Sequence, residues 1–469
     1  MNHLRYFAGR RDRQVECAIV GTGGFGRSFL AQARHVPGLS CRVAVDRDSA
    51  VAAAGLAGTG IPPERIARCE DATAARQAWE RGDVLALGDL ALVADLPLNV
   101  VLEATGVPEA GARHARLAIE TGWHVVMVSK ETDSVIGPVL SRMAAARGLV
   151  VSPVDGDQPS LLIGLATWAA VAGLKVLAAG KSSEYDFVFD PAAGTITSNG
   201  ATVAAPDFGA WLDPGDRPWA EVAAGRAHAA AMLSQRAVPD LCEMTVVANA
   251  LGLRPDRPDL HAPIARITEV ADLMTSRDFG GLMAGGGVLD VFHCLRLPDE
   301  PSFAGGVFVT VACEDDETWA MLRDKGHVVA RNGRSAMIGL PRHLLGIEAA
   351  TTVLEVGLLG VSSGGEHPRP VVDLTAHADA DLPAGRLLLA EGHHHTIADV
   401  SSRMTPAAPL SKAAPVPYYL AAGRRLIRDV AAGHPILCGD LDLDEGAELL
   451  QLRRAQDTVT DWEQGEGLC

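Results

Sequence analysis

The chain has 469 residues, of which 48% are hydrophobic and 21% are charged, and this predicts a soluble globular protein of two or three domains. Its net charge of −17 opposes binding to a phosphate backbone, so we do not expect a nucleic-acid partner. No apolar segment reaches the roughly 20 residues that span a bilayer, and the eight cysteines lack CxxC pairs. We therefore expect free thiols, a cytoplasmic location and no membrane partner.

The first third of the chain alternates between two hydrophobic patterns. Short apolar runs bounded by turn residues predict strands at 15–22, 40–48, 99–105, 124–130 and 149–155. Helical spacing predicts helices at 27–36, 64–83, 109–122 and 136–148. This alternation is typical of an α/β domain with a doubly wound parallel sheet, and we place that domain at residues 1–155.

The remaining chain predicts two more domains. A helix at 159–173 and a strand ending at Lys181 open an α+β domain at 156–365, which continues through buried segments at 241–253, 305–313 and 327–340. A Gly/Ala/Pro-rich stretch near 190–235 predicts a long loop or insertion. A helix at 342–360 is expected to return the chain to the first domain. Short apolar pairs among prolines predict a small β-rich domain at 366–469.

The strongest motif is "IVGTGGFGRSFL", in which a G-x-G-x-x-G pattern follows a strand and precedes a helix. The first glycine permits a tight turn, the second lets a pyrophosphate approach, and the third allows close packing of helix on strand. The alternative is a simple glycine-rich turn. We predict that a dinucleotide contacts Gly21, Thr22, Gly23, Gly24, Phe25 and Gly26.

Three more segments are expected around this dinucleotide. Asp46 ends the second strand, where an acidic residue holds the ribose 2′-hydroxyl of NAD, whereas Arg47 beside it suits the 2′-phosphate of NADP. The cofactor therefore stays open between NAD and NADP. Ala104, Thr105 and Gly106 follow a later strand and should lie beside the nicotinamide ribose. Lys130 follows the next strand and should point into the same cleft.

The candidate catalytic residues are Lys181, Lys130, Glu243 and Asp157. Only five of the 41 basic residues are lysines, and Lys181 ends an apolar strand in "AAGKSSEYDF". Asp157 could equally well cap the helix that follows it. Other polar residues are each more often structural than functional, namely Asn249, His261, Asp290 and His343. The histidines of "GHHHT" (His393 to His395) offer no identifiable metal-binding partners, so no metal site is predicted.

Six segments together resemble a known family: "IVGTGGFGRSFL", "VVLEATGVPEAG", "HVVMVSKETDSVIGP", "VVSPVDGDQPS", "AAGK" and "CEMTVVANALGL". They resemble the homoserine-dehydrogenase-like oxidoreductases with a C-terminal SAF-like domain, in particular the branch of 1-deoxy-D-xylulose 5-phosphate reductoisomerase-like enzymes. The resemblance implies a Rossmann domain for NADPH, a central domain that holds the substrate and forms a homodimer, and an SAF-like third domain.

The residues after Lys181 depart from that branch. Where the branch has a second lysine and two asparagines that suit an anionic sugar phosphate, this chain has Ser182, Ser183 and Glu184. An added carboxylate repels a phosphate, so we expect a less anionic substrate. Asp46 also departs from the NADP-type ending of the second strand.

These features predict an NAD(P)-dependent oxidoreductase that transfers a hydride between nicotinamide and a small polyol, hydroxy acid or keto-sugar. Lys181 would polarise the carbonyl or act as general acid/base, with a pKa lowered by burial and by Lys130. Glu243 and Asp157 would hold substrate hydroxyls or relay the proton. Two alternatives remain: a reductoisomerase that isomerises before reduction, and a non-catalytic nucleotide sensor or assembly protein.

Overall fold

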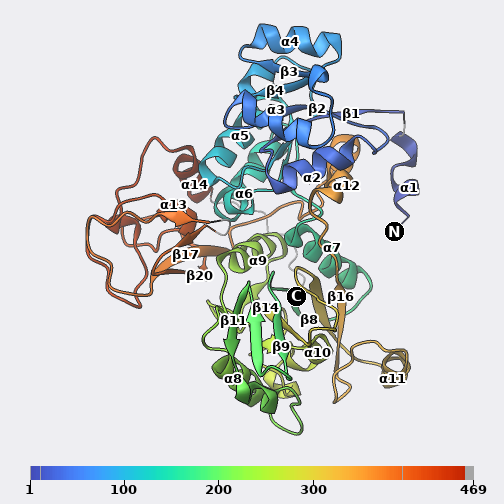
Figure 1. The fold of residues 1–469 in the computed structure, drawn as a ribbon, viewed down its shortest axis with the longest axis vertical. Helices are drawn as coiled ribbons and strands as arrows, with labels where there is room; N and C mark the ends of the chain where they lie inside the picture. The colour runs from blue at the N-terminus through green and yellow to red at the C-terminus, as the bar shows by residue number, and fades with distance from the viewer. Residues whose placement is uncertain (1, 11, 393–394, 460–469) are drawn as a thin grey trace.

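Figure 1 shows the fold in a computed structural model that describes residues 2–10, 12–392 and 395–459. A parallel sheet with its helices lies at one end, a mixed sheet lies at the other, and the C-terminal segment forms a lobe at the side of the junction. In the part of the chain that the structure describes, no helix combines the length and apolarity that crossing a bilayer requires.

The N-terminal sheet confirms the predicted doubly wound fold. Its strands are all parallel in the order β3-β4-β2-β1-β5-β6-β7. The chain runs outward from β1 and returns to pair β5 beside it, and this switch point opens a crevice at the carboxyl ends of the strands. The strands are β1 Val15–Val20, β2 Leu39–Val45, β3 Ile66–Cys69, β4 Val84–Leu87, β5 Val100–Glu103, β6 His124–Met127 and β7 Val151–Pro153. The helices are α2 Gly24–Ala33, α3 Ser49–Gly58, α4 Ala72–Arg81, α5 Pro108–Thr121 and α6 Lys130–Ala145.

The helix predicted at 64–83 is wrong in its first part. Residues Ile66–Cys69 form the edge strand β3, and the helix α4 begins only at Ala72. Asp71 separates the two elements, because its carboxylate accepts a hydrogen bond from the backbone N–H of Ala74 and so caps the helix. Strand β4, Val84–Leu87, was also not predicted.

The mixed sheet of the central domain has the order β11-β10-β9-β14-β8-β15-β16. At its centre, β8 pairs in parallel with β14 and antiparallel with β15. The strands are β8 Val176–Ser182, β14 Val288–Arg296, β15 Val307–Ala312 and β16 Ser335–Leu340. Two helices, α7 Gln158–Val171 and α9 Val238–Leu251, lie between this sheet and the N-terminal domain (Figure 1).

The insertion predicted as a loop near 190–235 is more ordered than expected. It holds β10 Thr195–Ser198, β11 Ala201–Ala204 and α8 Trp219–Ala229, and it adds to β9 Phe187–Asp190 at the edge of the sheet. Phe187, Phe189, Ile196 and Phe208 are all buried in a small core of their own. Alternating apolar residues therefore outweigh the many glycines and alanines around them.

The C-terminal segment confirms the expected small β-rich unit. Strands β17 Val372–Ala378 and β20 Val400–Pro406 form an antiparallel pair, which the short strands β18 Ala390–Glu391 and β19 Thr396–Ile397 extend. Helices α13 Tyr418–Ala421 and α14 Glu448–Thr458 complete it. The helix expected at 342–360 is shorter, α12 Ala349–Leu354, and it packs with the N-terminal core. The domain limits themselves remain predictions.

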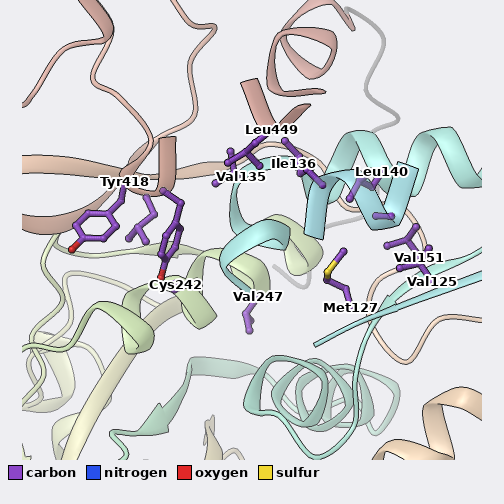
Figure 2. Packing of buried hydrophobic residues seen from close by; sticks show 14 of the residues in the cluster. Val125, Met127, Val135, Ile136, Leu140, Val151, Cys242, Val247, Tyr418 and Leu449 are labelled. Atoms are coloured by element: carbon purple, nitrogen blue, oxygen red, sulfur yellow. The ribbon is translucent and has the colours of Figure 1, made fainter. Parts of the chain in front are cut away.

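One hydrophobic core joins all three parts. Figure 2 shows residues of one cluster from all three parts: Val125 and Ile136 of the N-terminal domain, Val247 of α9, and Tyr418 and Leu449 of the C-terminal segment. Burial of apolar side chains stabilises a fold in proportion to the area removed from water. Because these residues belong to one continuous cluster, the contacts stabilise the three parts together.

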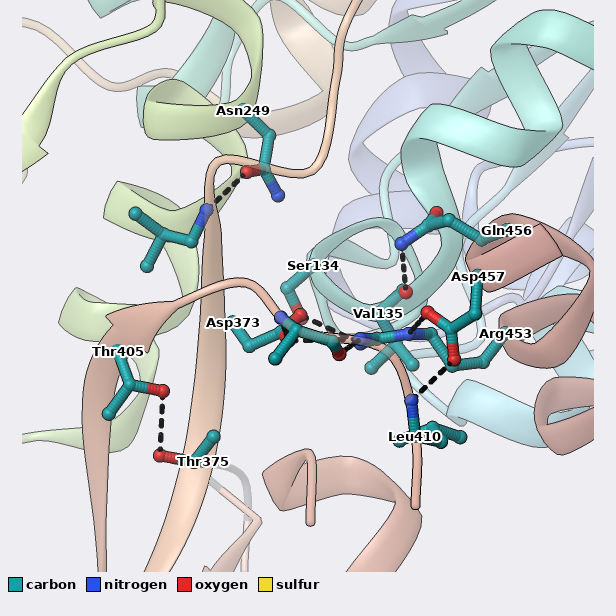
Figure 3. A network of polar contacts seen from close by, with 12 residues as sticks. Ser134, Val135, Asn249, Asp373, Thr375, Thr405, Leu410, Arg453, Gln456 and Asp457 are labelled. Atoms are coloured by element: carbon teal, nitrogen blue, oxygen red, sulfur yellow. Dashed lines mark hydrogen bonds and ion pairs between the residues drawn. The ribbon is translucent and has the colours of Figure 1, made fainter. Parts of the chain in front are cut away.

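A polar contact fastens the last helix to α6. Pro138 lies inside α6 and has no N–H to donate. Gln456 of α14 contacts the backbone of α6 beside this proline: its Oε1 accepts from the N–H of Val139 at 3.2 Å. Its Nε2 donates to the carbonyl of Val135 at 3.4 Å (Figure 3). Arg453, one turn earlier, binds the carboxylate of Asp373 on β17 through two nitrogens.

Candidate active site and dinucleotide cavity

A cavity of about 900 Å³ lies at the switch point of the parallel sheet. Its lining includes seven of the predicted dinucleotide contacts, namely Gly21, Thr22, Gly23, Asp46, Arg47, Ala104 and Thr105. The structure does not place Gly24, Phe25, Gly26, Gly106 or Lys130 in that lining. The cavity lies where open α/β sheets bind their ligands.

The glycine motif is required for the shape of this cavity. Gly21 has φ +97°, and a Cβ there would lie 2.4 Å from the carbonyl oxygen of Ala104. A Cβ on Gly26 would lie 2.1 Å from the carbonyl oxygen of Gly21, so Gly26 allows α2 to pack against the turn. Gly23 precedes α2, and the space around it is open. These are the three roles that the sequence pattern predicts.

Asp46 is held in place by the glycine-rich turn. Its Oδ2 accepts hydrogen bonds from the N–H of Thr22 at 2.7 Å and from Thr22 Oγ1 at 2.6 Å, and its Oδ1 accepts from the N–H of Arg47 at 2.8 Å. Burial alone would raise the pKa of Asp46, but these hydrogen bonds hold it below its usual value. Asp46 therefore presents a fixed negative charge at the wall of the cavity.

The four candidate catalytic residues come together on the other side of the crevice. Lys181 Nζ lies in ion-pair contact with Glu243 Oε2, and Lys130 Nζ lies 2.5 Å from Glu243 Oε1. Lys130 Nζ also lies 3.6 Å from Asp157 Oδ1. Lys181 and Glu243 are each 0% exposed. One carboxylate thus bridges two lysines at the junction of the N-terminal and central domains.

Three of these side chains come from the end of an element, and Glu243 comes from the interior of α9. Lys181 lies at the carboxyl end of β8, and Lys130 is the first residue of α6. Asp157 caps α7, since its Oδ1 accepts from the N–H of Gln158 at 3.0 Å. The capping role expected for Asp157 is therefore present, and its alternative, a catalytic role, stays a prediction.

The expected lowering of the pKa of Lys181 is wrong. Burial alone would lower the pKa of each lysine, but nearby carboxylates outweigh burial and raise both pKa values. For Lys181 these carboxylates belong to Asp240 and Glu243. Burial alone would raise the pKa of Glu243, whereas the two lysines lower it to about 2. The cluster therefore holds two ammonium groups and at least one carboxylate at neutral pH.

Sequence reasoning missed Asp240 and Ser183 as members of this site. Asp240 Oδ1 lies 2.9 Å from Lys181 Nζ, and Asp240 Oδ2 accepts a hydrogen bond from Ser183 Oγ at 2.7 Å. Asp240 and Glu243 are three residues apart on α9, so they share one face of the helix. That spacing could have identified Asp240 once the segment was recognised as a helix.

The other polar candidates have separate structural contacts, except for His343. Asn249 accepts hydrogen bonds from the N–H groups of Val371 and Val372, and the buried carboxylate of Asp290 accepts from the N–H of His261. His343 Nε2 lies 3.8 Å from Asp157 Oδ1, at the edge of the lysine cluster. His393 and His394 lie outside the described residues.

A comparison with protein families identifies the central domain. Residues 156–349 match the family model described as the catalytic domain of oxidoreductase DRL. The match confirms the expected enzyme class for this segment, which is that of an oxidoreductase. The homoserine-dehydrogenase-like family and the SAF-like third domain remain predictions. No curated protein matches the chain with significant similarity.

Solved structures resemble the chain at low sequence identity. Biliverdin reductase from Synechocystis sp. PCC 6803, in complex with biliverdin and NADP+, is 18% identical over 38% of this chain and 48% of its own, with a TM-score of 0.24. GenD2 from gentamicin A biosynthesis, in complex with NAD, is 13% identical over 74% of this chain and 87% of its own, with a TM-score of 0.33. DOX-P reductoisomerase in complex with magnesium is 18% identical over 36% of this chain and 46% of its own, with a TM-score of 0.27.

This chain spans about half the length of the first of these proteins. NADP+ and NAD, the two cofactors expected from the sequence, are present in the first two structures. Such low TM-scores do not transfer the substrate of any of them to this chain.

Proposed function

We propose that this protein is an NAD-dependent oxidoreductase that interconverts a hydroxyl and a carbonyl group on a small polyol, hydroxy acid or keto-sugar. The observation that carries the proposal is the cluster of Lys181, Lys130 and Glu243, in which Lys130 of the N-terminal domain contacts the segment that matches an oxidoreductase catalytic domain. A bound dinucleotide would supply or accept the hydride at C4 of its nicotinamide. The chain must then bind the substrate oxygen and handle its proton.

Lys181 is suited to the substrate oxygen. An ammonium group has three N–H donors, and in Lys181 two of them face Asp240 and Glu243. A third donor is left to polarise a carbonyl oxygen or to stabilise the alkoxide that forms from a hydroxyl. Because the carboxylates keep Lys181 charged, we assign it this electrostatic role. Glu243 and Asp157 would hold substrate hydroxyls or exchange the proton of the substrate oxygen, and Lys130 and the partly exposed His343 lie beside Asp157.

NAD is favoured over NADP by the fixed charge of Asp46. A carboxylate at the end of the second strand accepts a hydrogen bond from a ribose 2′-hydroxyl and repels a 2′-phosphate. The two hydrogen bonds from Thr22 keep this carboxylate from rotating away. Arg47 is largely exposed at the same edge, with 82% of its side chain accessible. Solvent therefore screens its attraction for a phosphate.

Turnover by lysine variants tests the proposal. With NAD or NADH and a panel of polyols, hydroxy acids, keto-sugars and 1-deoxy-D-xylulose 5-phosphate, we expect Lys181→Ala to lower kcat by about 10²-fold or more. Lys175→Ala is the matched control. Lys175 is exposed and lies six residues earlier, just before β8, so this variant should keep full activity. An active Lys181→Ala enzyme would remove the assigned role.

The same assay separates the alternatives. Turnover of 1-deoxy-D-xylulose 5-phosphate with NADPH would establish the reductoisomerase. Tight dinucleotide binding without hydride transfer to any member of the panel would instead indicate a nucleotide sensor. Titration of the wild-type protein with both dinucleotides should show tighter binding of NAD than of NADP, and equal affinities would contradict the role of Asp46.

A further inference from the structure

We propose that His395, from the C-terminal segment, binds the nicotinamide ring of the dinucleotide. This inference rests on the proposed function and adds a contact from outside the N-terminal and central domains. The key observation is the position of its ring beside the turn that follows β5. A Cβ built on Gly106 in that turn would lie 3.8 Å from His395 Nε2.

Gly106 directly follows Ala104 and Thr105, which line the cavity, and is expected on its nicotinamide side. Its N–H donates to Ser129 Oγ at 2.8 Å, and Ser129 directly precedes Lys130 of the catalytic cluster. Asp46, which would hold the adenosine ribose, follows β2, on the other side of β1 from β5. A side chain that reaches Gly106 therefore approaches the reactive half of a bound dinucleotide.

The backbone of His395 is held in an uncommon conformation. Its φ is +50°, in the left-handed region that residues other than glycine seldom adopt. The Tyr418 hydroxyl fixes the chain on the C-terminal side of this residue, because it donates to the carbonyl of His395 at 3.2 Å and accepts from the N–H of Ile397 at 3.0 Å. Such strained residues persist where the surrounding contacts determine them, and they concentrate at functional sites.

A chain of contacts leads from His395 to the lysine cluster. The His395 ring lies edge-on to the ring of Tyr419, with centroids 6.2 Å apart. Tyr419 is buried and hydrogen-bonds with Cys242, whose Sγ donates to the backbone carbonyl of Lys130 at 3.3 Å. The C-terminal segment thus packs directly behind Lys130, which is expected to point into the nicotinamide cleft.

Two ligands distinguish contact with the nicotinamide half from a general effect. NADH contains the nicotinamide riboside, whereas ADP-ribose lacks the nicotinamide ring and keeps the adenosine and both phosphates. We expect His395→Ala to weaken NADH binding about five- to tenfold, as the loss of one or two hydrogen bonds implies, and to change ADP-ribose binding less than twofold. The fluorescence of bound NADH should also change. His395→Gln, which keeps a hydrogen-bonding group, should restore part of the affinity.

Two controls complete the experiment. His434→Ala removes an exposed histidine from the same segment and should leave both affinities unchanged. Equal loss of NADH and ADP-ribose binding in His395→Ala, or no loss in either His395 variant, overturns the inference and leaves the proposed function standing. A wild-type protein that binds neither ligand overturns both.

Discussion

Glu243 is the residue on which the charge balance of the site depends. Its two oxygens face two different lysines; Glu243 and Lys181 are fully buried, and the side chain of Lys130 is 18% exposed. Removal of one partner from a buried ion pair leaves the others uncompensated, which costs far more than the pair contributes. The same arrangement keeps the lysines charged and in place when the site is empty.

A variant of this residue tests that balance. We expect Glu243→Gln to lower the free energy of unfolding at pH 7 by about 3–5 kcal/mol, measured by urea denaturation. Glu64→Gln, at an exposed position, should change it by less than about 0.5 kcal/mol. A small effect of Glu243→Gln would show that the lysines lose their charge or move apart at low cost.

The difference in free energy of unfolding between the wild type and Glu243→Gln should depend on pH. The pKa of Glu243 falls in the folded state to about 2, below its usual value of 4.5. Its contribution to stability is therefore fully present above about pH 4.5 and is lost as the pH falls towards 2. The difference in free energy of unfolding between wild type and Glu243→Gln should therefore become smaller as the pH falls over that interval. A gap that stays constant would contradict the lowered pKa.

At the scale of elements, the contact between α14 and α6 joins distant parts of the chain. Replacement of Gln456 by leucine would leave the buried N–H of Val139 and the carbonyl of Val135 without their present partners. Each such group costs about 1–3 kcal/mol, so we expect a loss of about 2–4 kcal/mol in urea unfolding. Gln451→Leu, on the exposed face of α14, is the matched control. Unchanged stability would mean that the two groups of α6 bond directly to each other once Gln456 is gone.

The sequence predicted some elements well because their pattern is local. Strands of the parallel sheet are continuous apolar runs, and Lys130 and Lys181 stand out as rare lysines at strand ends. Prediction of Asp240 as a site residue required the register of α9. Prediction of the direction of the lysine pKa shifts required knowledge of which carboxylates fold beside the lysines. Gln456 and His395 gave no local signal, since their partners lie in other domains. Long-range contacts of this kind are invisible to periodicity.

At the scale of the whole molecule, the shared core predicts cooperative unfolding. Arg453 on α14 pairs with Asp373 on β17, and both lie among side chains of the common core. We expect Arg453→Met to lower the midpoint of thermal unfolding by the same amount in far-UV circular dichroism and in fluorescence of bound NADH. A transition in NADH binding that stays at the wild-type temperature would show that the N-terminal domain unfolds independently.

The contact of Gln456 with α6 also has a consequence for synthesis of the chain. A ribosome completes α6 long before it reaches α14, although domains usually fold as they emerge. Until Gln456 has been synthesised, the N–H of Val139 and the carbonyl of Val135 lack these two side-chain contacts. We therefore expect α6, the helix that begins with Lys130, to reach its final packing only after α14 has been made.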